Sequence, residues 1–136
     1  MSRAANKGLH VGLLWLRVLM GFGMAYHGFG KVFGGNMDGF IQGVTNLGFP
    51  KPEIFAWAAA LSEFGGGLLI VIGLLTRPAA LFVLCTMFVA AFMQHSGDPF
   101  KDKELALAYL VIAGALMMTG AGRYSLDDKI KKKYSG

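Results

Sequence analysis

The stretch IFAWAAALSEFGGGLLIVIGLL, residues 54–75, decides the fold class of this chain. It runs for 22 residues with a single ionisable side chain, Glu63, and a helix of about 20 predominantly apolar residues can cross the hydrocarbon core of a bilayer. Comparable stretches cover residues 9–27, 79–95 and 104–121. Because lipid offers no hydrogen-bond partners to the backbone, we expect an all-α integral membrane protein, a bundle of four spanning helices.

The composition of the whole chain supports a membrane protein. Of its 136 residues 54% are hydrophobic and only 15% are charged, whereas soluble domains carry about 25% charged residues. These values exclude a disordered chain, a collagen and a coiled coil. The lone cysteine, Cys85, excludes a disulfide-stapled domain and a CxxC redox pair, and its apolar neighbours predict a buried, inert thiol. The short connections leave room for one domain only, covering residues 1–136.

The distribution of basic residues orients the four predicted spans. Arg17 interrupts the first span and further spans follow it, so we expect a retained helix and no cleaved signal peptide. Four crossings place both termini on one side, where eight Lys and Arg residues lie outside the spans, against four on the other side. The positive-inside rule then predicts cytoplasmic termini. The basic tail, residues 122–136, accounts for much of the net charge of +5 without nucleic acid as a partner.

Within this tail, Ser125 and Asp128 have the spacing of a capping box. They predict the start of a short basic helix close to the membrane. The lysines that follow favour membrane lipids with anionic headgroups as its partner.

The long connection between the first two spans, residues 28–53, has an unusual composition. It contains seven glycines and four phenylalanines, and it ends near Pro50 and Pro52. A polar linker would not carry so many phenylalanines. We therefore expect a partly helical flap on the extracytoplasmic surface, lying on the bundle or re-entering it over a site.

Two ionisable residues lie at bilayer depth, where an unpaired charge costs several kcal/mol. Arg17 is ten residues below the outer end of the first span, and Glu63 is nine residues below the outer end of the second. The corresponding depths are about 15 and 14 Å. We therefore predict an Arg17–Glu63 ion pair at mid-bilayer that handles a proton. The alternative is a purely structural pair that fixes the register of two helices.

A second polar set is expected at the outer ends of the spans. His27 ends the first span and His95 ends the third, and a histidine near neutral pH can donate, accept or exchange a proton. The soft side chain of Met24 suits a flat lipophilic ligand such as a quinone. Alternatives are interfacial histidines without a ligand, two axial ligands of one haem, and a metal site with Glu104 as third ligand.

Six short motifs run through nearly the whole chain in a specific order and spacing. They are Arg17, His27-Gly-x-x-Lys31, Gly48-Phe-Pro, Glu63-Phe-Gly-Gly66, Gly73-Leu-Leu-Thr-Arg77 and, after Gly120, Ser125-Leu-Asp127. In this order they resemble the DoxX family of small bacterial membrane proteins.

The resemblance implies a four-helix protein of the bacterial inner membrane. It also implies a link to thiosulfate:quinone oxidoreductase and to thiol, quinone and oxidative-stress chemistry. Arg17, His27, Lys31, Glu63 and Arg77 carry over as motif positions, and Lys31 is expected beside the ligand.

These observations predict a membrane subunit of a redox system. A quinone would hydrogen-bond to His27 or His95, while Glu63 and Arg17 would handle the proton. The sequence contains no flavin, haem or Fe–S motif, so electrons would come from a partner protein or from a soluble thiol or thiosulfate donor. Two alternatives stay open: a scaffold for partner oxidoreductases, with homo-oligomer contacts through Gly- and Ala-rich helices, and a small oligomeric transporter.

Overall fold

The computed structural model describes residues 2–136, and over this range every regular element is a helix. The predicted all-α fold is therefore confirmed. The elements are α1 (Arg3–Val32), α2 (Met37–Asn46), α3 (Pro52–Ile72), α4 (Thr76–Val89), the π-helix η1 (Ala90–Gln94), α5 (Phe100–Thr119) and α6 (Leu126–Tyr134).

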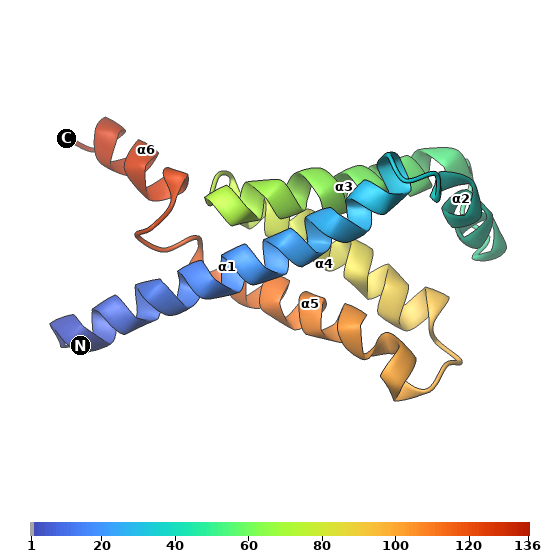
Figure 1. The fold of residues 1–136 in the computed structure, drawn as a ribbon, viewed down its shortest axis with the longest axis horizontal. Coiled ribbons are helices and arrows are strands. Elements are labelled where there is room, and N and C mark those ends of the chain that lie inside the picture. The colour runs from blue at the N-terminus through green and yellow to red at the C-terminus, as the bar shows by residue number, and fades with distance from the viewer. Residues whose placement is uncertain (1) are drawn as a thin grey trace.

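The long helices form two packed pairs that share a central contact. α1 packs along α3, α4 packs along α5, and α3 contacts α4, while the short α2 covers one end of α3 (Figure 1). Both chain termini lie at the end of the molecule opposite α2 (Figure 1). This placement is what an even number of crossings requires. The side of the membrane on which the termini lie stays a prediction.

Three helical segments are long and apolar enough to cross a membrane: α1, α3, and α4 together with η1. The fourth predicted span corresponds to α5, which is 20 residues long but carries Asp102, Lys103 and Glu104 in its opening turns. Its outward face is nonetheless apolar, since Val111 and Met118 are 66% and 79% exposed. Large exposed apolar side chains suit lipid better than water, and a fourth crossing through α5 stays a prediction.

Helix α1 extends at both ends beyond the apolar stretch that predicted it, residues 9–27. α1 begins at Arg3, where the Ser2 hydroxyl accepts a hydrogen bond from the Ala5 amide at 3.1 Å, and it continues five residues past His27 to Val32. A hydropathy pattern detects only the part of a helix that lies in hydrocarbon, whereas the backbone hydrogen bonds continue into the interface. This extension includes Lys31 in the helix that packs along α3.

Glycines bring α1 and α3 into unusually close contact. A Cβ atom built on Gly67 would lie 2.6 Å from both the Ala25 amide nitrogen and the Gly21 carbonyl oxygen. One on Gly28 would collide with the backbone of Phe64. Small residues permit this approach of two helices in lipid. The contact fixes the register of the pair: Gly21 lies opposite Gly67, and Gly28 lies opposite Phe64.

The predicted partly helical flap is the segment that contains α2. It packs on the first half of α3, where Met37 and Val44 form a buried apolar cluster with Ala56 and Ala60. The flap returns through Lys51, whose φ of 49° is left-handed, and Pro52 then opens α3 as its first residue. Proline suits this position because it lacks the amide hydrogen that a first helical turn leaves unpaired.

Candidate functional site

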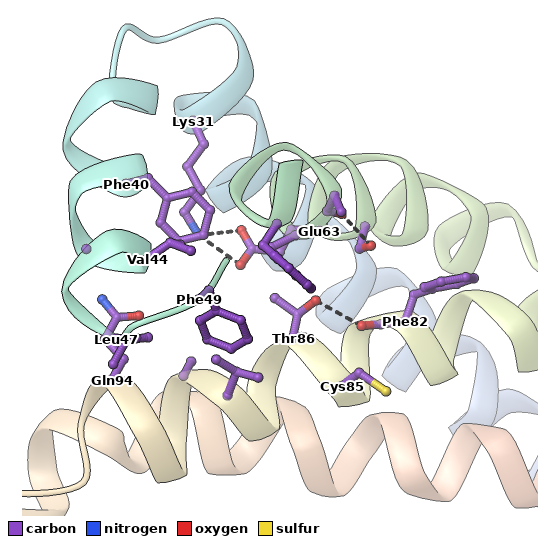
Figure 2. A pocket seen from close by; sticks show the side chains of 17 residues that line it. Lys31, Phe40, Val44, Leu47, Phe49, Glu63, Phe82, Cys85, Thr86 and Gln94 are labelled. Atoms are coloured by element: carbon purple, nitrogen blue, oxygen red, sulfur yellow. Dashed lines mark hydrogen bonds and ion pairs between the residues drawn. The ribbon is translucent and has the colours of Figure 1, made fainter. Parts of the chain in front are cut away.

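A cavity of about 380 Å³ lies between α2, the first half of α3, and α4 with η1. We call it the flap pocket. Figure 2 shows Phe40 and Val44 on α2 facing Glu63 on α3, with Thr86 and Cys85 on α4. Its walls are mostly apolar, and they are lined by Lys31, Phe40, Gly43, Val44, Leu47, Phe49, Phe55, Ala58, Ala59, Ser62, Glu63, Phe82, Cys85, Thr86, Val89, Ala90 and Gln94.

An ion pair between Lys31 and Glu63 supplies the charged groups of the flap pocket. The Lys31 ammonium donates to both carboxylate oxygens of Glu63, at 2.8 and 2.7 Å (Figure 2). Glu63 is 2% exposed. The same ammonium lies 4.2 Å from the ring centroid of Phe40 on α2, a cation–π contact. The flap thus contacts the cation of the pair directly, through Phe40.

The predicted Arg17–Glu63 ion pair is wrong, because Glu63 pairs with Lys31. The depth estimate assumed that the two helices start at the same level, with His27 opposite the start of α3. In the observed register Gly28 lies opposite Phe64, so Lys31 is the cation that reaches Glu63. Arg17 lies fourteen residues earlier in α1, about 21 Å along the axis.

Arg17 instead joins three segments at the end of the molecule opposite α2. Its side chain is fully buried, and Nη2 donates to the carbonyl oxygen of Tyr124. Gly73, the left-handed C-cap of α3, lies against the guanidinium and has no space for a side chain there. Asp127 completes this junction: its carboxylate accepts from the Leu75 and Thr76 amides at 2.8 and 3.0 Å, and its own amide donates to the Gly73 carbonyl.

The junction explains two of the sequence motifs. The segment from Gly73 to Arg77 and the segment from Ser125 to Asp127 are about fifty residues apart in the chain and meet here. The predicted capping interaction is confirmed, since the Ser125 hydroxyl accepts from the Asp128 amide at 3.2 Å. These contacts cap helix ends and hold the two segments together, which is a structural role.

The two histidines lie outside the flap pocket. His27 is exposed, and its ring packs edge-to-face against Tyr26 and Tyr109, with centroids 6.1 and 6.2 Å away. His95 follows η1, and its Nδ1 lies 2.8 Å from a carboxylate oxygen of Asp98. The structure therefore brings neither histidine to the buried carboxylate of Glu63.

Met24 and Glu104 also lie away from the pocket. Met24 is 1% exposed in the main apolar core, on the face of α1 that packs against α3 and α5. Glu104 is exposed near the start of α5. Of the residues predicted to contact a ligand, the structure brings Lys31 and Glu63 together at one cavity.

The prediction of a buried Cys85 is wrong, because this residue is exposed and lines the flap pocket. The buried face of α4 consists of Ala80, Val83 and Met87. Successive helical residues are about 100° apart, so Cys85 lies on the side of α4 opposite Val83. Apolar neighbours in the sequence did not reveal which face of the helix is covered.

Two further pocket residues, Ser62 and Thr86, were not identified from the sequence. Each hydroxyl donates to a carbonyl one turn earlier in its own helix, at 2.7 and 2.9 Å. This bond satisfies the hydroxyl hydrogen and leaves an oxygen acceptor facing the cavity. Isolated Ser and Thr residues are common in membrane helices, so no sequence signal separates these two from others.

Comparisons with known proteins identify relatives over most of the chain. The family model described as DoxX matches residues 12–96. "Inner membrane protein YqjF" of Escherichia coli (strain K12) is 34% identical over 131 residues, which cover 91% of this chain and 95% of that protein. "Inner membrane protein YphA" of the same organism is 35% identical over 113 residues, covering 74% and 76%. "Putative oxidoreductase CatD" of Bacillus subtilis (strain 168) is 31% identical over 128 residues, covering 93% and 92%. No solved structure gives a match.

Proposed function

The chain belongs to the DoxX family of membrane proteins, and from this premise we propose that it binds a quinone in the flap pocket as a membrane subunit of a redox system. The observation that carries the proposal is the Lys31–Glu63 pair on the wall of an otherwise apolar cavity. Ionisable groups at membrane depth mark ligand and proton sites. One relative carries the name "Putative oxidoreductase CatD", which supports the same class of chemistry.

The residues of the flap pocket fit a flat, lipophilic ring. Its volume of about 380 Å³ lies within the range of roughly 300–1,000 Å³ typical of small-molecule sites. Phe40, Phe49 and Phe55 provide aromatic faces for a ring, and Val89 adds aliphatic surface. The charged groups are confined to one part of the wall, as expected for a ligand with a polar edge.

Lys31 and Glu63 have separate tasks in this proposal. An ammonium group has three N–H donors; Lys31 directs hydrogen bonds to the two oxygens of Glu63, and the remaining donor is available for a ligand oxygen. Glu63 accepts or returns the proton that accompanies electron transfer. Glu63 itself is buried, so the proton passes between its carboxylate and the ligand at a position with little access to bulk solvent.

A bound quinone supplies the two-electron, two-proton chemistry, and the electrons come from a partner dehydrogenase or a thiol donor. In this account Lys31, and not His27 or His95, contacts the ligand. The proton is handled by the Lys31–Glu63 pair and not by Arg17. The protein would span the inner membrane four times, with cytoplasmic termini and the flap on the extracytoplasmic side.

Quinone content of the purified protein tests the proposal. Wild-type protein, Lys31→Met and the control Lys51→Met are purified in detergent, and quinones are extracted and quantified by mass spectrometry. Lys51 is an exposed lysine of the same segment that does not line the pocket. We expect one quinone per chain in the wild type and the control, and a loss of at least about tenfold in Lys31→Met.

Circular dichroism and thermal unfolding of each variant show that it is folded. A folded wild type that carries only phospholipid, and binds no added short-chain quinone, would contradict quinone binding. The scaffold alternative would then be favoured, and co-purifying enzymes would identify the partner.

A further inference from the structure

A second cavity, of about 630 Å³, lies at the end of the molecule opposite α2. It is formed by the start of α4, the segment after α5 and helix α6, together with His10 of α1. Arg77 of α4, Arg123 of the segment after α5 and Lys131 in the last turn of α6 line it. We call these three residues and the space between them the basic pocket.

Two acidic residues, Asp127 and Asp128, line the same cavity, so its three cations exceed its carboxylates by one. Asp127 accepts from the amides at the start of α4. Asp128 forms an ion pair with Lys132 at 2.6 Å, and the hydrogen bond from Lys132 lowers the pKa of Asp128 below its ordinary value. Among the described residues 2–136, the ion pairs involve other cations, so the basic pocket retains a positive charge.

Two polar groups of the basic pocket are also available for a ligand. The Thr76 hydroxyl is buried and has no hydrogen-bond partner within the described part of the chain. The Arg77 guanidinium makes one long hydrogen bond, from Nη2 to the Met118 carbonyl at 3.4 Å. An arginine fork and a hydroxyl donor match the oxygens of a phosphate group.

The adjoining helix α6 has an apolar face that none of the described residues 2–136 covers. Leu126, Ile130 and Tyr134 follow one another at intervals of four residues and are 38%, 46% and 79% exposed. No residue of α6 is buried, and the helix projects from the bundle (Figure 1). At about 100° per residue, Lys129 and Lys133 lie along one edge of this apolar face and Lys131 lies along the other. An apolar face bordered by lysines is typical of a helix that lies in the membrane–water interface.

We propose that the basic pocket and the apolar face of α6 together bind an anionic phospholipid. The phosphate is held by Arg77, Arg123 and Lys131, and the apolar face of α6 lies at the boundary between headgroups and acyl chains. The pocket is at the ends of α3, α4 and α5, where headgroups lie if these helices cross the bilayer. The apolar face distinguishes a lipid from free phosphate, since an inorganic ion leaves that face in water. This lipid is separate from the quinone, which would bind at the other end of the molecule.

Lipid retention measured by native mass spectrometry tests the basic pocket. The full-length protein is released into the gas phase from mixed micelles that contain phosphatidylglycerol and phosphatidylcholine, and the lipids that remain bound are counted. Arg77→Gln/Arg123→Gln/Lys131→Gln is compared with Lys51→Gln/Lys101→Gln/Lys103→Gln, which removes the same charge elsewhere. We expect the first variant to retain at least about tenfold less phosphatidylglycerol and the second to match the wild type. Equal retention by both variants would overturn the proposal.

A second arm separates lipid from soluble phosphate. Inorganic phosphate is added to the lipid-depleted protein, and no stable phosphate adduct is expected. An adduct that depends on the same three residues, without selectivity among lipids, would overturn the lipid assignment in favour of a soluble anion.

Spin labels on α6 test its position relative to the membrane surface. Ile130→Cys and Lys132→Cys are labelled in the Cys85→Ser background and placed in nanodiscs that hold one chain. With phosphatidylglycerol present, we expect position 130 to be accessible to oxygen and position 132 to a water-soluble nickel chelate. In phosphatidylcholine alone, position 130 should shift towards water. Equal water accessibility at both positions in both lipids would overturn the proposal. The labelled protein is also placed in larger vesicles, where chains can meet, and spin–spin broadening from a second chain there would overturn it too.

Discussion

Lys31 reaches Glu63 because α1 continues to Val32 and the glycine contacts fix its register on α3. The sequence alone identified Glu63 as a functional candidate, since a carboxylate in a spanning stretch is rare. Its partner could not be identified in this way. Counting depth from the apolar boundaries placed Arg17 at the same level, and a shift of a few residues between two helices changes which cation is nearest.

The Lys31–Glu63 pair is expected to behave as a coupled unit. Lys31→Met leaves the buried Glu63 carboxylate without its partner and should lower the free energy of unfolding by about 3 kcal/mol, whereas Glu63→Met leaves a partly exposed ammonium and should lower it less. Lys31→Met/Glu63→Met removes both charges and should recover most of that loss. Unfolding in SDS–detergent mixtures measures all four proteins. Additive losses in the double variant would contradict a direct pair.

Arg17 is predicted to stabilise the junction and not to bind the ligand. Arg17→Met removes the donor to the Tyr124 carbonyl and should lower the free energy of unfolding by about 2–3 kcal/mol. Quinone content per folded chain should equal that of the wild type. If Arg17→Met has unchanged stability and carries no quinone, the structural role is contradicted and Arg17 contributes to ligand binding. Arg17→Lys should rescue poorly, because an ammonium lacks the planar fork of a guanidinium.

At the scale of the elements, the close contact between α1 and α3 has a matched control. A Cβ at Gly67 would collide with α1, whereas one at Gly65 meets nothing within 4 Å. Gly67→Ala should therefore destabilise the protein by about 1–3 kcal/mol, and Gly65→Ala should be neutral or stabilising by up to about 1 kcal/mol. Thermal unfolding in detergent checks both. Equal effects of the two substitutions would mean that the helices are further apart than described.

The positions of the helices in the sequence were largely predictable. Which face of each helix is buried was not. Apolar length located α1, α3, α4 and α5, and the phenylalanines of residues 28–53 predicted a helical flap over a site. Apolar residues are found on both faces of a membrane helix, since lipid and core are equally hydrophobic. This is why Cys85 was assigned to the wrong face, and why Met24 was assigned to a ligand and not to the core.

At the scale of the whole molecule, an even number of crossings places the termini together and the flap on the other side. Single cysteines in the Cys85→Ser background test this arrangement. Gly39→Cys on the flap should react with a membrane-impermeant maleimide in intact cells, and Lys132→Cys on α6 should react only after permeabilisation. Both positions are exposed. Labelling of both cysteines in intact cells would contradict four crossings and favour three.

Photo-crosslinking tests the central claim, a quinone under the flap, most directly. A photoreactive quinone is bound to the wild-type protein, irradiated and mapped by peptide mass spectrometry, with a fully substituted unlabelled quinone as competitor. We predict competed crosslinks on α2 and α4, at pocket residues such as Phe40 and Thr86, and their loss in Lys31→Met. Competed crosslinks at His27 and Tyr109 instead, unaffected by Lys31→Met, would contradict the account and return the ligand to the histidines.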